Sequence, residues 1–197
     1  MKNKKMSQKS RSELWQIFKA FSYVIGSRDR YDEELISKLA GYASAIGERI
    51  GLDPAEVEQL EFAVLIHDIG QIRIRETILK KPGRLTRREF LEVQSHPIES
   101  EKIISMMPNL SWAAQWSRWH HEWWDGSGYP DRLAGEAIPP PSRILLIVDA
   151  FGAMLSERPY RPAMSKEEAV AELKLMAGIQ FDPGMVSIFE KIVNEND

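Results

Sequence analysis

Apolar residues recur at intervals of three and four positions along most of this chain, as they do on one face of an amphipathic helix. The alternation expected of strands does not rise above noise, and there is no internal repeat. The pattern predicts an all-α fold with a single helical-bundle domain over residues 12–197, preceded by a flexible basic tail over residues 1–11. Its helices are expected at 12–25, 32–50, 54–67, 86 onward, 111–122, 141–155, 165–178 and 183 onward.

Start and stop signals support these helices. Asp53, Thr86 and Ser165 are each followed three residues later by glutamate, which is the spacing of a capping box. Pro97 is expected to break or restart the helix that begins near Thr86. Loops are expected at 70–83 and 123–141. The second loop is rich in glycine and proline, and a loop of that length in a compact domain is usually functional.

Composition limits the partners and the cellular compartment that can be expected for the protein. The chain has 197 residues and a formal net charge of -3, which argues against binding of a nucleic acid polymer. It has no cysteine, its start lacks the apolar core of a signal peptide, and its apolar runs are too short to cross a bilayer. We therefore expect a cytoplasmic protein with no membrane association.

The four histidines, with two aspartates, suggest a metal site. Histidine occurs at His67, His96, His120 and His121, and aspartate interrupts two apolar runs at Asp68 and Asp149. A lone histidine on an apolar helix is more often a hydrogen-bonded core residue than a ligand. Two doublets and two buried carboxylates are harder to explain in that way, because an unpaired buried carboxylate is costly and a shared cation would satisfy it. Imidazole and carboxylate suit iron, manganese or zinc.

The sequence also resembles a known family. The segments HDIG at 67–70, HHEWWDGSGYP at 120–130 and ERPYRPA at 157–163 closely resemble the HD-GYP family, and the likeness runs in order from about residue 22 to the C-terminus. This resemblance implies an HD-superfamily helical bundle. It also implies a bacterial hydrolase that acts on cyclic di-GMP, giving linear pGpG, GMP or both, at a centre of two or three metal ions, often iron or manganese.

Carried over by position, the resemblance assigns roles to single residues. It implies that Asp68 bridges two metals and that catalysis depends on Asp68 and His67. It places Tyr129, Arg158 and Arg161 against the substrate. The implied metal ligands are His67, Asp68, His96, His120, His121 and Asp149.

Two positions depart from the family pattern. Leu35 stands where the family usually has a histidine ligand, and Gln71 stands where it usually has a lysine that touches the scissile phosphate. Gln71 is therefore expected to offer the substrate a hydrogen bond without charge. Of two expected divalent ions, the one held by His67, Asp68 and Asp149 would be weakened by the loss at Leu35.

Supporting roles are expected in the same region. Gly126 and Gly128 should permit positive φ in the loop. Glu122 is expected either to accept a hydrogen bond from a ligand histidine or to face water.

Three functions stay open at this point: a cyclic di-GMP phosphodiesterase, a degenerate module that binds cyclic di-GMP or a partner protein without efficient catalysis, and an HD-type hydrolase for another nucleotide or cyclic dinucleotide. The expected ligand is a cyclic dinucleotide, and both a homodimer and a separate regulatory protein are left open as partners.

Overall fold

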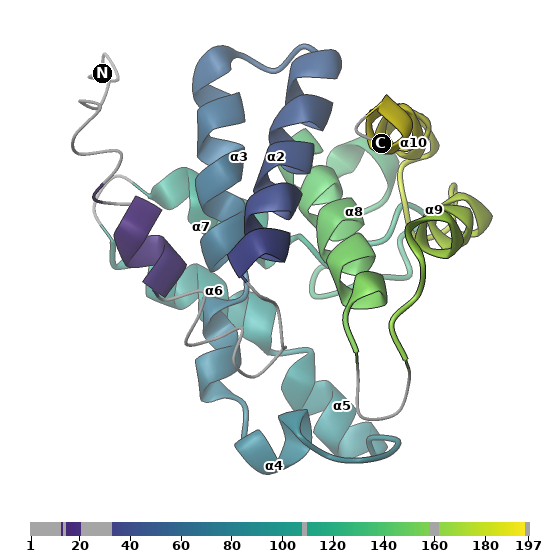
Figure 1. Ribbon diagram of the computed structural model, residues 1–197. Coiled ribbons are helices and arrows are strands. Elements are labelled where there is room, and N and C mark those ends of the chain that lie inside the picture. The colour runs from purple at the N-terminus through teal and green to yellow at the C-terminus, as the bar shows by residue number, and fades with distance from the viewer. Residues whose placement is uncertain (1–12, 14, 21–32, 108–109, 158–161, 196–197) are drawn as a thin grey trace.

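The computed structural model describes residues 13, 15–20, 33–107, 110–157 and 162–195 (Figure 1). Within these ranges the only β pairing is one isolated bridge, between Ala177 and Phe181, so the predicted all-α class is confirmed. The α-helices and the 3-10 helices (η) are α2 (Glu33–Arg49), α3 (Pro54–Ile66), η1 (Ile69–Arg73), α4 (Glu76–Leu79), α5 (Arg87–Val93), α6 (His96–Ser105), α7 (Ser111–Arg118), η2 (Gly135–Ala137), α8 (Pro140–Leu155), α9 (Lys166–Leu175) and α10 (Pro183–Glu195).

Helix α3 lies between two apolar clusters. Leu60 and Val64 belong to the larger cluster, which also draws on α2, α8, α9 and α10. Phe62 and Ile66 belong to the second cluster, with residues of η1, α6 and α7. A helix buried on opposite sides is apolar around its circumference, which explains the run of apolar residues in the second half of α3. Any polar group that directly follows α3 therefore lies deep in the molecule.

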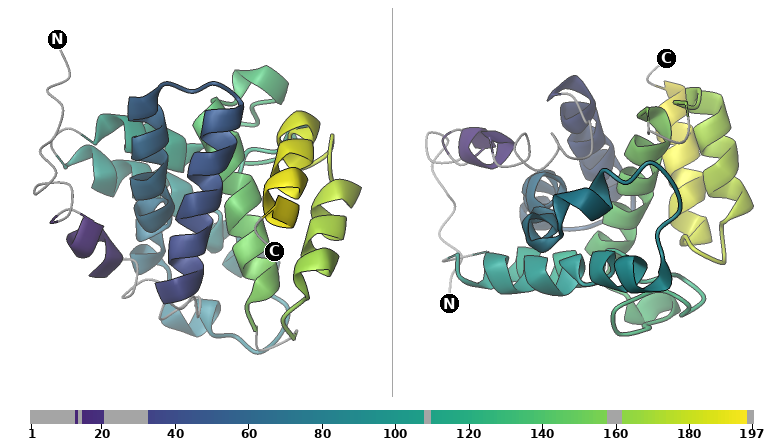
Figure 2. Two further views of the ribbon diagram at one scale, coloured as in Figure 1. Left: turned by 45° about the horizontal axis from the view of Figure 1, so that its top comes forward. Right: turned by 90° about the horizontal axis from the view of Figure 1, so that it is seen from below.

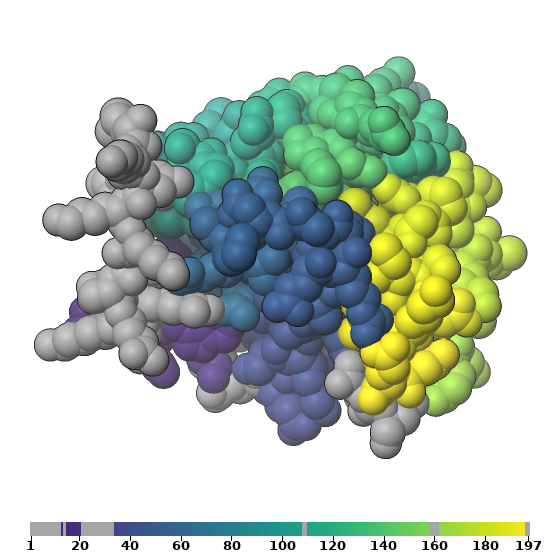
Figure 3. Space-filling model, turned by 90° about the horizontal axis from the view of Figure 1, so that it is seen from above, coloured from purple at the N-terminus to yellow at the C-terminus, as the bar shows by residue number. Residues whose placement is uncertain are grey.

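The long helices stand side by side. Figure 2 shows α8 between α2 on one side and the pair α9 and α10 on the other. On the face seen in Figure 3, α10 lies directly beside α2. Tyr42 of α2 joins these helices, because its ring centroid is 5.9 Å from that of Phe151 in α8 and 5.4 Å from that of Phe189 in α10. Helices α6 and α7 pack against each other, and α6 also packs against η1.

Three of the predicted helix starts are confirmed by their capping boxes. Capping boxes are present at Asp53, Thr86 and Ser165. In each, the side chain of the capping residue accepts the N–H of the third helical residue, and the glutamate side chain at that third position accepts the N–H of the capping residue. At Pro97 the helix restarts, because α5 ends at Val93 and α6 begins at His96.

Several predicted elements differ from the structure: the helix expected at 165–178 ends at Leu175, and the loop expected at 123–141 holds η2 and the start of α8. The segment 70–83 was expected to be a loop, but it holds most of η1 and all of α4. The helix expected at 111–122 ends at Arg118, so the histidine pair lies in the turn that follows. That turn is shaped by tertiary contacts, since the N–H of Tyr129 donates to the carbonyl of His121, 3.1 Å away. Local periodicity does not report such a contact.

The N-terminal prediction is tested only in part. Residue 13 and residues 15–20 are helical, Phe18 is buried, and Trp15 meets the ring of Phe62 edge-on. The remainder of the predicted helix at 12–25 and the tail at 1–11 lie outside the described residues. Among the described helices, none combines the length and the apolar character that crossing a membrane requires.

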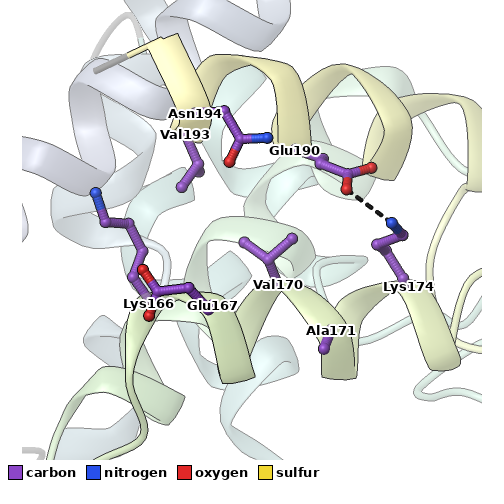
Figure 4. Close-up of a pocket in the computed structure, with 8 residues that line it drawn as sticks. All are labelled: Lys166, Glu167, Val170, Ala171, Lys174, Glu190, Val193 and Asn194. Atoms are coloured by element: carbon purple, nitrogen blue, oxygen red, sulfur yellow. Dashed lines mark hydrogen bonds and ion pairs between the residues drawn. The ribbon is translucent and has the colours of Figure 1, made fainter. Parts of the chain in front are cut away.

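A pocket of about 230 Å³ lies between α9 and α10 (Figure 4). Val170, Ala171 and Val193 give it an apolar floor, and an ion pair of 2.7 Å joins Lys174 to Glu190 across it. None of the residues predicted to bind metal or substrate lines this pocket.

Candidate metal centre

The six predicted ligands lie at the ends of helices or within one, and they gather into two groups. One group is Asp68, His96, His120 and His121, and the other is His67, Asp68 and Asp149. Within each group, one donor atom from every residue lies within 4.8 Å of the others, and Asp68 belongs to both. The ligands come from the chain after α3, the first residue of α6, the turn after α7, and α8.

Three of the histidines are held in the same way. The Nδ1 atoms of His67, His96 and His120 lie 3.1, 2.7 and 2.6 Å from the backbone carbonyl three residues earlier. A carbonyl can only accept, so each Nδ1 carries the proton. In the neutral imidazole Nε2 is then a bare lone pair, which is the form that binds metal.

These lone pairs face one another and a carboxylate. Oδ1 of Asp68 lies 3.0 Å from Nε2 of His96 and 3.3 Å from Nε2 of His120, and the two Nε2 atoms are 3.3 Å apart. Among the described residues, Oδ1 of Asp68 and Nε2 of His67 are buried without a hydrogen-bond partner. Acceptors that meet in a buried space repel one another unless a proton or a metal ion lies between them.

In the second group, two carboxylates favour a proton on His67 when no metal is bound, and a divalent ion would displace that proton. Burial by itself lowers the pKa of His67, but the carboxylates of Asp68 and Asp149 outweigh it and raise that pKa to about 9. Burial by itself raises the pKa of Asp68, but the neighbouring imidazoles, with His67 foremost, hold it well below its usual range. Asp68 is thus an anion in a buried place, and it attracts positive charge.

In the first group, burial by itself lowers the pKa of His96, but the charge of Asp68 outweighs it and raises that pKa, whereas the pKa values of the other two imidazoles are lowered. Burial lowers the pKa of His120, and burial together with the charges of His120 and His96 lowers the pKa of His121 well below its usual range. Four donors that include one carboxylate and three imidazoles are a suitable set for a divalent transition metal. The residues present therefore fit a divalent metal centre.

A glycine lets the segment that carries Asp68 approach the helix that begins with His96. A Cβ on Gly70 would lie 2.1 Å from the carbonyl oxygen of His96 and 2.5 Å from the backbone nitrogen of Ser100. The N–H of Gly70 also donates to Oγ of the buried Ser100, at 2.8 Å. This close approach of η1 to the first turn of α6 brings Asp68 to His96. Ser100 was not predicted, because a serine in an amphipathic helix carries no sign that it is buried.

The GSGYP segment covers the histidine pair. A Cβ on Gly128 would lie 2.2 Å from the backbone nitrogen of Trp123 and 2.5 Å from the carbonyl oxygen of His121. The ring of Tyr129 stacks on that of His121, with centroids 5.0 Å apart and planes at 29°. Gly126 has a φ of 82°, as expected, but Gly128 does not have positive φ. Gly128 is needed for close packing instead, and the prediction for it was wrong.

Two predicted neighbours of the site have other contacts than expected. Gln71 is buried, and its Nε2 donates to Oδ2 of Asp68 at 2.8 Å, so its amide holds a ligand. Its contact with substrate stays a prediction. Glu122 neither faces water nor accepts a hydrogen bond from a ligand histidine, and both expectations were wrong. It is 1% exposed and accepts from the N–H groups of Asp131, Arg132 and Leu133.

The other substrate-contacting predictions are not tested. Arg158 and Arg161 lie outside the described residues. Leu35, at the position of the missing histidine, is half-buried in α2 and packs against the larger apolar cluster. Helix α2 packs along α8, which carries Asp149.

Comparison with known proteins agrees with this geometry. Residues 4–185 match the HD domain family. The chain is 36% identical over 183 residues to the cyclic di-GMP phosphodiesterase response regulator RpfG of Xanthomonas campestris pv. campestris, across 92% of this chain and 47% of the relative. It is 35% identical over 158 residues to the 3'3'-cGAMP-specific phosphodiesterase 1 of Vibrio cholerae, across 80% of this chain and 37% of the relative.

A solved structure shares the fold. The crystal structure of the Vibrio cholerae cyclic GMP-AMP specific phosphodiesterase V-cGAP3 superposes with a TM-score of 0.71 at 21% identity, covering 92% of this chain and 49% of that one. The chain spans about half or less of the length of these relatives. The family match and the HDIG and GSGYP motifs together show that the chain belongs to the HD domain family, in its HD-GYP group.

Proposed function

We propose that this chain is a metal-dependent phosphodiesterase that hydrolyses cyclic di-GMP to linear pGpG, GMP or both. The observation that carries the proposal is the buried meeting of the Nε2 atoms of His96 and His120 with the carboxylate of Asp68, beneath the GSGYP segment. Relatives that match most of this chain include phosphodiesterases for cyclic di-GMP and for 3'3'-cGAMP.

The proposed roles follow the chemistry of each side chain. When bound, two divalent ions neutralise phosphate charge and activate water for attack on phosphorus. Asp68 would bridge the two groups, and His67 would complete the second one. Arg158 and Arg161 would grip phosphate or guanine through their planar forks. Tyr129 would border the bound dinucleotide, and Gln71 would add a hydrogen bond without charge.

Iron or manganese suits the first group better than zinc. Asp68 and the histidines His96, His120 and His121 already offer four ligands. Zinc usually binds four ligands in all, so this group would leave it no open position for a phosphate oxygen. Iron and manganese accept additional ligands.

A second candidate is a degenerate module that binds cyclic di-GMP or a partner protein without efficient turnover. It is favoured by Leu35, which leaves the second group with three protein ligands, and by the bond from Gln71 to Asp68. Under this alternative the protein would hold one tightly bound ion and still bind the dinucleotide.

Activity and metal content separate the candidates. The protein is purified anaerobically, its iron and manganese are counted, and it is assayed on cyclic di-GMP and on 3'3'-cGAMP. We expect hydrolysis of cyclic di-GMP that is lost after dialysis against a chelator and restored by iron or manganese. Bound metal and bound dinucleotide without turnover would favour the degenerate module. Hydrolysis of 3'3'-cGAMP alone would reassign the substrate.

Leu35→His should strengthen the second group. The added imidazole supplies the ligand that the family usually has there, so binding of the second ion should tighten by roughly tenfold or more, the lower end of what supporting residues of metal sites contribute. Isothermal titration of the metal-free protein with manganese measures this. Leu35→Asn is the control, since it adds polarity without an imidazole. Equal stoichiometry and affinity in both variants and the parent would contradict the prediction.

A further inference from the structure

We propose that Glu122 is a positioning residue of the metal centre. By holding the backbone that follows the GSGYP segment, its carboxylate keeps Tyr129 stacked on His121 and so fixes that imidazole as a ligand. The inference rests on the proposed function, in that it takes His121 as a metal ligand.

The carboxylate of Glu122 accepts hydrogen bonds from three consecutive backbone N–H groups. Oε1 accepts from Asp131 at 2.6 Å and from Arg132 at 3.1 Å, and Oε2 accepts from Leu133 at 3.0 Å. Arg132 has a φ of 59°, in the left-handed region that costs energy for any residue except glycine. A left-handed residue within such a run turns successive N–H groups toward one anion. Here that anion is the buried Glu122 carboxylate, which compensates for the strained backbone.

The segment held by Glu122 wraps around the histidine turn. The side chain of Asp131 receives hydrogen bonds from Arg118 at 2.6 and 2.9 Å and from Nε1 of Trp119 at 2.7 Å. Tyr129 donates its N–H to the carbonyl of His121. Hydrogen bonds therefore attach residues 128–133 to residues 118–122, and the bonds to Glu122 are made to a buried carboxylate.

His121 depends on this arrangement more than the other ligands do. The rings of His67, His96 and His120 are each fixed by a bond from Nδ1 to a backbone carbonyl. For the ring of His121 no hydrogen bond is found within the described part of the chain. Its orientation comes from ring contacts, with Tyr129 stacked at 5.0 Å and His120 at 4.0 Å.

The consequence is specific to one metal group. His121 belongs to the group with Asp68, His96 and His120, and it does not belong to the group with His67 and Asp149. Loss of the Glu122 carboxylate should therefore weaken the four-ligand group and leave the three-ligand group little changed.

Glu122→Gln tests this with minimal change of shape. The glutamine amide cannot accept from both sides of the carboxylate, so one N–H donor of residues 131–133 would face another donor. Asp182→Asn is the matched control. The Asp182 carboxylate likewise accepts two backbone N–H groups, from Gly184 and Met185, and pairs with Arg143 at 2.6 Å, but it belongs to neither metal group.

Two readouts are needed, one of them independent of metal. In the metal-free protein, nuclear Overhauser contacts between the rings of Tyr129 and His121 should be lost in Glu122→Gln and kept in Asp182→Asn. In the cobalt-loaded protein, Glu122→Gln should weaken the tighter site by about 10- to 100-fold and change its visible absorption spectrum, as loss of a supporting residue does. Tyr129→Leu should weaken the same site, and the double variant should lose little more.

The outcomes separate this inference from the proposed function. Preserved ring contacts, or unchanged cobalt affinity and spectrum in folded Glu122→Gln protein, would overturn the role of Glu122. An equal loss of affinity in Asp182→Asn would also overturn it, because the effect would then be general destabilisation. A parent protein that binds cobalt but hydrolyses no cyclic dinucleotide would refute the phosphodiesterase, while the loss of ring contacts would still support the role of Glu122.

Discussion

Asp68→Asn is expected to abolish tight metal binding and to lower phosphodiesterase activity by about three orders of magnitude, since metal stabilisation of the reacting phosphate is worth several kcal/mol and each 1.36 kcal/mol is tenfold in rate. Asp68 is the only residue in both ligand groups, so the change affects both ions. Asparagine has nearly the same shape but no charge. Its amide N–H can also donate to the Nε2 atoms of His96 and His120, which occupies the lone pairs that metal would use.

Thermal unfolding measures this loss without an activity assay. An ion present at 100 times its Kd stabilises the folded state by about 2.7 kcal/mol. For a domain of this length that raises Tm by roughly 5–10 °C. The parent should show this gain with manganese and Asp68→Asn should not. Asp53→Asn is the control: Asp53 is a helix N-cap, and asparagine caps as well as aspartate. A full metal-dependent gain in Asp68→Asn would contradict the assignment.

Gly70→Ala is expected to destabilise the protein by about 3 kcal/mol, at the upper end of the usual range for overpacking. The new methyl would meet the carbonyl oxygen of His96 and the backbone nitrogen of Ser100, and backbone atoms at a helix start cannot move aside as a side chain can. Moving η1 away from α6 would also separate Asp68 from His96. We therefore expect weaker metal binding together with the loss of stability.

Gly41→Ala is the control, and its expected effect on stability has the opposite sign. Gly41 lies within α2, and a Cβ there would meet no heavy atom within 4 Å. Alanine at such a site should stabilise by roughly 0.5–1 kcal/mol, because glycine loses more conformational freedom on folding. Urea unfolding of both metal-free variants tests the pair. A Gly70→Ala protein as stable as the parent would show that η1 and α6 need not be so close.

The helices could be predicted largely because their signals are local. The capping boxes at Asp53, Thr86 and Ser165 are each complete within four residues, and all three are present. The end of α7 could not be predicted in this way. The chain leaves that helix at Trp119, and just beyond it the later residues Gly128 and Tyr129 pack on the backbone of residues 121–123. Helical periodicity carries no information about so distant a segment.

The candidate site was predictable for its charged and imidazole side chains but not for the residues that support them. Asp68 and Asp149 stand out because a carboxylate in an apolar run needs a partner. Ser100 and Glu122 give no comparable signal, because serine and glutamate in helices or turns usually face water. Both are buried here, and each binds backbone of a segment distant in sequence or across a loop. Only the folded structure brings those donors to them.

The spread of the ligands along the sequence has a consequence for the lifetime of the protein. Residues 67 and 149 are separated by more than a third of the chain, and no cysteine is available to staple the intervening segments covalently. An ion bound to Asp68 and its neighbours would act as that staple, closing several loops at once. When metal is scarce, the first effect would then be faster digestion of this protein by proteases. Part of the fall in substrate turnover would come from the smaller number of molecules that survive.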